Sequence, residues 1–239
     1  MRIRNIFVLL LAGAFVLSTR GESVTGTISI TKKLTKRNVT PDVSVYQRGM
    51  AVELGKDPKE DPLAFERSRV VLYLEGPGPA GSEPAPQIAQ LDRRFVPDLV
   101  VIPVGSTVSF PNMDPIFHNV FSLSKAKTFD LGSYDKGESK HIVFSKPGIV
   151  EVYCHLHPNM AATIMVTPNH WYARVGASGQ YRIDDVPPGT YTLVAWHKSA
   201  GFFRRTIVVG PGHDAVANFV IPITEGSDQT APDAGGQAQ

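Results

Sequence analysis

The feature that most constrains the fold of this chain is a succession of short apolar segments separated by turn residues. From about Gln87 onward, apolar segments such as LVVIPV, HNVFSL and IVEVYC alternate with breakers such as NMDP, DKGE and KPG. Beyond the first 21 residues, no stretch repeats its apolar residues with the period of a helix. Short strands at this spacing predict an all-β sandwich or barrel. At 239 residues, the chain is long enough for one large or two small domains.

Residues 1–21 have the pattern of an export signal. A basic start, MRIRN, precedes an uninterrupted apolar run from Ile6 to Leu17. As a helix this run would reach about 18 Å, well short of the roughly 30 Å hydrocarbon core of a membrane. We therefore predict an export signal and a periplasmic or other cell-envelope location, with no membrane span after the signal is removed. The alternative is an uncleaved membrane anchor.

The charge balance disfavours some classes of partner. Arg2, Arg4 and Arg20 all lie in the signal segment, so the formal net charge falls from +2 to −1 without it. No excess of basic residues then remains to attract nucleic acid or an acidic membrane surface. We expect no nucleic-acid partner.

The single cysteine lies in a dense group of potential metal ligands. In the segment VYCHLHPNM, Cys154 is followed by His155, His157 and Met160. One cysteine cannot form an internal disulfide, so Cys154 is a buried apolar residue, a reactive thiol or a metal ligand. A trigonal site of two histidines and one cysteine, with a weak methionine bond, is typical of blue copper. His118, thirty-six residues before Cys154, is the candidate for the missing histidine.

Two runs around these residues resemble the cupredoxin family, the plastocyanin and amicyanin type of blue copper domain. The run FVPDLVVIPVGSTVSFPNMDPIFHNV has the family's order of Phe-x-Pro, an apolar strand, Gly-Ser-Thr-Val, Asn, Asp and His-Asn-Val. The run KGESKHIVFSKPGIVEVYCHLHPNM has its Gly-Glu turn, strand, Pro-Gly and Tyr-Cys-x-x-His. The resemblance covers residues 85–167 and implies a Greek-key cupredoxin sandwich there.

The resemblance also implies one copper ion, cycling between Cu(II) and Cu(I), bound by His118, Cys154, His157 and Met160. Asn119 matches the family residue that ties the two ligand-bearing loops together and whose backbone N–H donates to the cysteine sulfur. This chain departs from the family pattern at Leu156, where a proline is usual immediately before the second histidine. Two alternatives stay open: Met160 as a core residue, and His155 in place of His157 as the ligand.

The segments on either side of the copper motifs resemble a carboxypeptidase regulatory-like domain, a smaller prealbumin-like β sandwich. VTGTISI and VVLYLEG come before the motifs, and VPPGTYTLVAW, the most specific part, comes after them. We expect a discontinuous sandwich over residues 22–77 and 168–223, with the copper domain inserted into it. The alternative is serial, with the early strands part of the copper domain. A polar stretch before Val70 is expected to be a solvated loop with a short helical turn, and residues 224–239 a disordered tail.

Together these expectations describe an exported type 1 copper protein that carries single electrons. With every ligand position filled, the metal keeps no open position for a substrate, so we expect no enzymatic activity. The partner would be a redox protein, such as a c-type cytochrome or a dehydrogenase. It would dock on an apolar patch beside His157 formed by Pro115, Leu156 and Pro158.

Two other functions remain open at this stage. One is a copper-binding or copper-delivery protein of the cell envelope without a redox partner, and the other is an adhesion protein with a vestigial site. A delivery protein is expected to have exposed Met and His clusters, and the sequence shows none. The remaining histidines fit no ligand pattern; they are His141, His170, His197 and His213.

Overall fold

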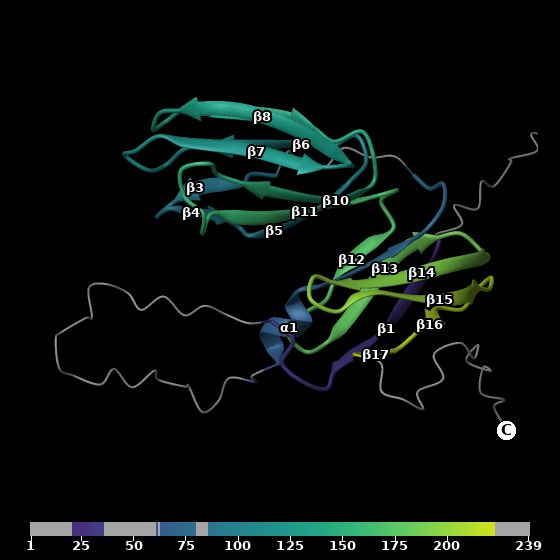
Figure 1. Cartoon of the computed structure of the whole chain (residues 1–239). Coiled ribbons are helices and arrows are strands. Elements are labelled where there is room, and N and C mark those ends of the chain that lie inside the picture. The colour runs from purple at the N-terminus through teal and green to yellow at the C-terminus, as the bar shows by residue number, and fades with distance from the viewer. Residues whose placement is uncertain (1–20, 36–60, 62, 80–85, 223–239) are drawn as a thin grey trace, which may run out of the picture.

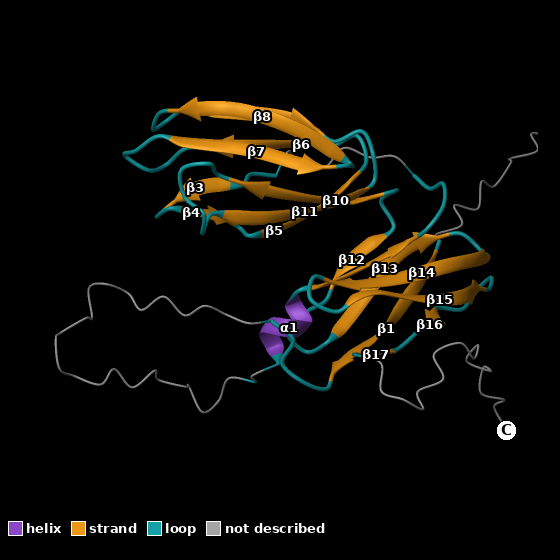
Figure 2. Cartoon of the chain, viewed as in Figure 1, coloured by secondary structure: helices purple, strands orange, loops and turns teal. Residues whose placement is uncertain are grey.

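The computed structural model describes residues 21–35, 61, 63–79 and 86–222 and consists of two β sandwiches (Figure 1). We call residues 86–167 the central sandwich, and residues 21–35, 63–79 and 168–222 the flanking sandwich. Strands dominate both (Figure 2), so the prediction of an all-β fold is confirmed. Within the described residues, no helix is both long and apolar enough to cross a membrane. The predicted signal, apart from Gly21, and the predicted tail lie outside the described residues.

The central sandwich contains the strands β3 (Ala89–Leu91), β4 (Arg94–Val96), β5 (Leu99–Pro103), β6 (Thr107–Pro111), β7 (His118–Ser124), β8 (Lys127–Tyr134), β9 (Ser139–Val143), β10 (Gly148–Tyr153) and β11 (Ala161–Thr167). Its main sheet has the order β5-β11-β10-β7-β8. The strands β6 and β9 form one further ladder, and β3 and β4 another. A single apolar core, which includes Phe110, Phe144 and Ile164, lies between these layers.

The flanking sandwich contains the helix α1 (Ala64–Ser68) and the strands β1 (Glu22–Ile30), β2 (Val70–Leu74), β12 (Tyr172–Arg174), β13 (Gln180–Val186), β14 (Gly189–His197), β15 (Gly201–Val209), β16 (Ala215–Val216) and β17 (Phe219–Ile221). One sheet has the order β12-β2-β14-β15, and the other has the order β13-β1-β16, with β17 also paired to β1. Thus β1 and β2 precede the central sandwich in sequence but pair with strands that follow it. The limits of this domain and its carboxypeptidase regulatory-like identity stay predictions.

The apolar run of β5 is continuous because both of its faces are covered. Val100 and Ile102 point into the core of the central sandwich. Leu99 and Val101 point the other way, toward the flanking sandwich. Side chains alternate between the two faces of a strand, so a strand buried on both sides is apolar at every position.

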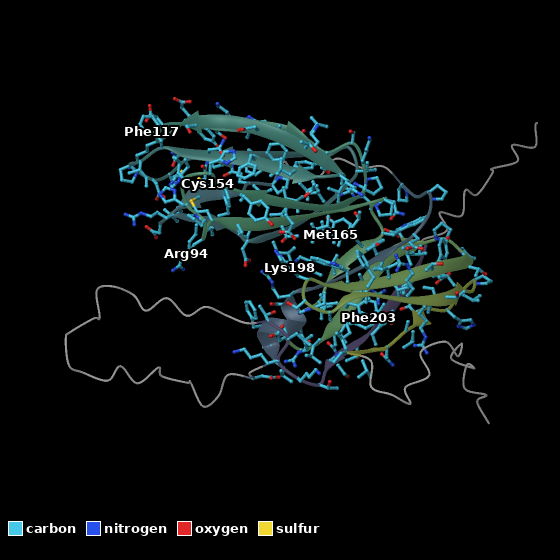
Figure 3. All side chains as sticks on the ribbon, viewed as in Figure 1. Arg94, Phe117, Cys154, Met165, Lys198 and Phe203 are labelled. Atoms are coloured by element: carbon cyan, nitrogen blue, oxygen red, sulfur yellow. The ribbon has the colours of Figure 1, made fainter. Side chains whose placement is uncertain are left out.

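The two sandwiches meet through a small apolar cluster with polar contacts at its edge. The cluster consists of Val71, Leu99, Val101, Met165 and Trp196. Beside it, Lys198 Nζ lies 2.8 Å from Glu151 Oε2 and 2.7 Å from Thr163 Oγ1 of the central sandwich. Figure 3 shows Met165 and Lys198 in the region between the sandwiches. The central sandwich is therefore held to its neighbour by packing as well as by the chain connections.

The sequence analysis did not identify β4 and β8. β8 is an edge strand of the main sheet, and its residues alternate between half-buried and exposed over most of its length. Only one face of such a strand is covered, so the segment KTFDLGSY contains few apolar residues. Phe129 and Leu131 pack against the core of the central sandwich. The pairing of β8 with β7 depends on this tertiary contact rather than on a strongly apolar sequence.

Candidate metal centre

Antiparallel pairing brings the predicted ligand segments to one end of the central sandwich. His118 is the first residue of β7, and Cys154 directly follows β10, which is antiparallel to β7. The start of one antiparallel strand lies beside the end of its neighbour. The loop from Cys154 to Met160 then leads into β11. Figure 3 shows Cys154 at this end, together with Phe117 and Arg94.

Three of the four predicted ligands converge. The Nδ1 atoms of His118 and His157 lie 3.2 Å apart, and Cys154 Sγ lies 3.8 Å from His157 Nδ1. All three donor atoms lie within 4.8 Å of one another. His118 is fully buried, Cys154 is buried, and His157 is half-buried.

The spacing of these atoms fits a shared metal ion. A first-row metal such as zinc binds nitrogen at about 2.0 Å and sulfur at about 2.3 Å, so two ligands of one ion lie at most about 4.3 Å apart. The two distances given above are below this limit, and the third, between His118 and Cys154, is at most 4.8 Å. The donor types and the two shorter distances therefore fit a metal ion bound by two imidazoles and a thiolate, with a shift of about half an ångström at the third pair.

The hydrogen bond of His118 fixes which of its nitrogens faces the centre. His118 Nε2 lies 2.7 Å from Asp114 Oδ2. An ionised carboxylate only accepts hydrogen bonds, so Nε2 carries the proton. In the neutral ring, Nδ1 is then unprotonated and directs its lone pair toward His157 and Cys154.

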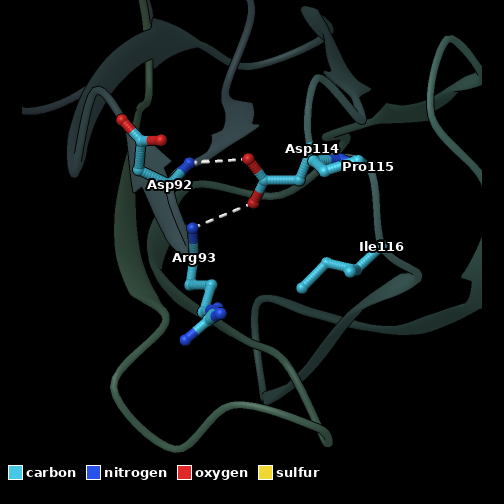
Figure 4. Close-up of a pocket in the computed structure, with 5 residues that line it drawn as sticks. All are labelled: Asp92, Arg93, Asp114, Pro115 and Ile116. Atoms are coloured by element: carbon cyan, nitrogen blue, oxygen red, sulfur yellow. Dashed lines mark hydrogen bonds between the residues drawn. The ribbon is translucent and has the colours of Figure 1, made fainter.

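Asp114 is itself held in place by hydrogen bonds from the backbone. Its carboxylate accepts hydrogen bonds from the backbone N–H of Asp92 at 2.7 Å and from that of Arg93 at 2.9 Å (Figure 4). Burial raises the pKa of Asp114, but the hydrogen bonds from His118 and from the two backbone N–H groups outweigh burial and hold its pKa below the usual value. Asp114 is therefore an anion at neutral pH. The sequence analysis noted this aspartate as part of a motif but gave it no role.

The environment of His157 favours its neutral form. Burial lowers the pKa of the imidazole, and the neighbouring His118 and the charge of Arg93 lower it further, while Asp114 opposes them. A histidine binds metal only through an unprotonated nitrogen. This ring is therefore ready to bind a metal at neutral pH.

Met160 lies in the core next to the centre. Its side chain is fully buried and belongs to the same apolar cluster as Cys154. Its backbone N–H donates to the carbonyl oxygen of His157 at 2.9 Å, which closes the loop between them. Its burial places it in the core of the central sandwich, and its role as a ligand stays a proposal.

Asn119 connects the two segments that contain the donors. Its Oδ1 accepts from the backbone N–H of His155 at 3.4 Å, and its Nδ2 donates to Asp130 Oδ1 at 2.7 Å. His155 points away from the centre: its exposed ring stacks on Phe121, with the ring centroids 3.8 Å apart. In the structure, the imidazole that turns inward is that of His157 and not that of His155.

Apolar side chains are exposed around His157, together with the charged side chain of Arg93. Leu156, Pro158 and Pro115 are exposed beside it. The residues before His118 extend this surface, and three of them that were not predicted to belong to it are also exposed: Met113, Ile116 and Phe117. Large exposed apolar side chains gathered in one region indicate an interaction surface. A pocket of about 320 Å³ opens in the same region, lined by Asp92, Arg93, Asp114, Pro115 and Ile116 (Figure 4).

Comparisons with known proteins give similar structures but no family. No protein-family model matches the chain, and no curated protein does. Similar solved structures include a mutant of amicyanin in its oxidized state, with 20% identity over 34% of this chain and 81% of that chain and a TM-score of 0.33. Another is a purple cupredoxin from Nitrosopumilus maritimus, with 27% identity over 34% of this chain and 98% of that chain and a TM-score of 0.31.

A third similar structure is the copper-containing nitrite reductase of Thermus scotoductus SA-01. The identity is 28% over 39% of this chain, with a TM-score of 0.33, and the match spans a quarter (25%) of that enzyme. All three likenesses are to cupredoxins or copper proteins and concern about a third of this chain.

Proposed function

We propose that this chain is a type 1 copper protein that carries single electrons between redox partners. The observation that supports this most is the convergence of His118 Nδ1, His157 Nδ1 and Cys154 Sγ within 4.8 Å, at one end of a β sandwich. Two imidazoles and a thiolate with a weak methionine bond form the donor set of blue copper sites. Met160 is proposed as that fourth, weak ligand.

Copper bound there would accept and release one electron. The contribution of the protein is to keep the donors fixed while this happens. His118 is held by Asp114, Asn119 ties the Cys154 loop to β7, and Cys154 is buried in a packed core. A site of fixed geometry suits both oxidation states of copper moderately well, so little rearrangement accompanies electron transfer.

The exposed apolar side chains around His157 form the proposed site at which electrons enter and leave the protein. His157 is half-buried, so this residue is partly accessible to a partner, whereas His118 and Cys154 are buried. The partner is proposed to be a redox protein, such as a c-type cytochrome or a dehydrogenase, that covers Leu156, Pro158 and Phe117. Transient redox complexes bury little surface, below about 1,200 Å², so a small apolar patch is sufficient for such a partner. We propose a carrier rather than an enzyme, exported to the periplasm or cell envelope by residues 1–21.

The test is the visible spectrum and redox cycling of the chain loaded with Cu(II). We expect an intense thiolate-to-copper charge-transfer band and reversible one-electron reduction. Cys154→Ala and His118→Ala should abolish the band, whereas His141→Ala, a substitution of an exposed histidine, should leave it unchanged. A colourless complex without reversible cycling would instead indicate a copper-delivery protein.

The role of Met160 needs its own variant. Met160→Leu nearly conserves volume, and such a swap usually costs less than about 1.5 kcal/mol of stability. If the thioether binds the metal, the spectrum and the reduction potential change while the fold persists. The same spectrum and potential in the variant would show that Met160 only packs the core.

A further inference from the structure

The carboxylate of Asp114 is a buried charge. Neither packing in the apolar core nor the formation of a turn requires a charge at this position. Asp114 is 5% exposed and lies four residues before a fully buried histidine. Burying a charge is costly unless it is paired and hydrogen-bonded. The two hydrogen bonds from backbone N–H groups satisfy part of this need, and the third partner is His118 Nε2.

The turn that supplies the N–H groups is built around this anion. Asp92 and Arg93 connect β3 to β4 with φ angles of 53° and 54°. This left-handed conformation is disfavoured for residues other than glycine. It lets both N–H groups point at Asp114, one to each carboxylate oxygen (Figure 4). The fold therefore fixes the charge in one place rather than leaving it to a mobile side chain.

We propose that Asp114 is a positioning residue that orients His118 and lowers the reduction potential of the copper centre by placing a fixed negative charge behind this ligand. The inference rests on the proposed copper function. Its physical basis is that a ring N–H shared with a carboxylate makes the other ring nitrogen a stronger donor. A stronger donor and a nearby anion both favour Cu(II) over Cu(I). Because both groups are buried, water screens this effect weakly.

A second, purely structural role for Asp114 makes a different prediction. If its only task were to hold the turn, its removal would change stability but not the copper potential of the protein that still folds. The substitution Asp114→Asn removes the charge, while the amide oxygen can still accept from the Arg93 N–H and from His118 Nε2. The amide Nδ2 would face the Asp92 N–H, so the turn loses one hydrogen bond. The copper potential, and not the stability, therefore separates the two roles. Asp92→Asn is the matched control, because it removes the same charge from an exposed carboxylate in the same region.

The experiment measures the spectrum and the reduction potential of the full chain and of both variants. We expect Asp114→Asn to remain blue and to bind Cu(II) at least tenfold less tightly relative to Cu(I), which raises the potential by about 59 mV or more. Asp92→Asn should stay within a small fraction of that shift. An unchanged potential in a blue Asp114→Asn protein would overturn the inference and leave the copper function standing, whereas a colourless wild-type chain would overturn the copper function itself.

A measurement on the wild-type chain covers the case in which Asp114→Asn does not fold. Nitrogen-15 NMR of the histidine rings in the diamagnetic Cu(I) form reports which nitrogen carries the proton. We expect His118 to be protonated at Nε2, with a strongly deshielded proton shared with the carboxylate. A proton on Nδ1 instead would refute the positioning role.

Discussion

The two sandwiches of this chain are both built mostly of antiparallel strands, with a few parallel pairs, but their interiors are filled differently. The core of the flanking sandwich is a large apolar cluster that includes Leu72, Phe203 and Phe219. The central sandwich has a comparable apolar core, but at one end it buries polar and ionisable groups, among them Asn112, Asp114, His118 and Asn119. Buried polar groups must be paired with one another or with a ligand to offset the loss of water. The flanking sandwich also buries one ionisable pair, Glu66 and His197. Within the described residues, only the central sandwich brings together side chains that fit a metal ion, so we expect a metal to stabilise the central sandwich and not the flanking one.

The largest change in the free energy of unfolding is expected from a substitution where the two sandwiches touch. Trp196 is 2% exposed in the cluster between them. Trp196→Ala should cost about 3–5 kcal/mol of unfolding free energy and separate the unfolding of the two sandwiches into two transitions. Calorimetry and denaturant titration would measure both. Val208→Ala, on an exposed position of β15, is the control and should change stability by no more than about 0.5 kcal/mol.

The second largest change in stability is expected from the binding of copper. At a free copper concentration a hundred times the dissociation constant, binding should stabilise the central sandwich by about 2.7 kcal/mol. In the Trp196→Ala protein only one of the two transitions should shift with copper. The Cys154→Ala variant should lose most of the shift. Equal shifts of both transitions would contradict the view that only one sandwich depends on the ion.

A pH effect should come from the one buried ionisable pair of the flanking sandwich. His197 Nε2 lies 3.2 Å from Glu66 Oε2, and both side chains are essentially inaccessible. Burial lowers the pKa of His197, and the Glu66 carboxylate only partly offsets this. The unfolded chain therefore takes up a proton first, and stability falls as the pH drops below about 6.5 toward the lowered pKa.

One proton limits the slope of this loss to about 1.4 kcal/mol per pH unit. His197→Gln keeps a donor for Glu66 but cannot become charged, so denaturant titrations between neutral and mildly acid pH should show a smaller slope than in the wild type. His141→Gln is the control, at an exposed position. A slope that does not change in His197→Gln would show that this histidine does not contribute.

The smallest effect is expected at the edge of the contact between the sandwiches. Lys198→Met removes the ion pair with Glu151 but leaves the apolar cluster in place. Because the lysine is partly exposed, the loss should be at most about 1 kcal/mol, measured by denaturant titration at low salt. Lys125→Met, at an exposed position of the central sandwich, should have no effect. A loss as large as that of Trp196→Ala would mean that charge rather than packing joins the two sandwiches.

Much of the central sandwich could be predicted because most of its strands are marked by apolar residues that are close together in the sequence. LVVIPV and IVEVYC became β5 and β10, since a strand buried on one or both faces needs apolar residues at regular positions. β8 could not be predicted, because an edge strand covered on one side needs few of them. His197 fitted no ligand pattern in the sequence, and its burial became visible only once α1 placed Glu66 beside it.

The candidate centre also contains some residues that could be identified from the sequence and others that could not. Cys154, His157 and Met160 lie within seven residues, so their soft donors could be recognised as a group from the sequence. Asp114 could not be assigned, because its partners at Asp92 and Arg93 lie 22 and 21 residues away and depend on the β3–β4 turn. The apolar residues Met113, Ile116 and Phe117 were missed because an apolar residue in a loop does not reveal whether it faces a core or water.

By itself, the sequence determined the all-β character of this protein and the set of side chains able to bind copper, because strand periodicity and donor chemistry are properties of neighbouring residues. Only the tertiary structure decided which imidazole faces the thiolate, which nitrogen of His118 is free, and which charge lies behind it. These depend on contacts between segments far apart in the chain, formed when β7 and β10 pair and the β3–β4 turn closes over Asp114.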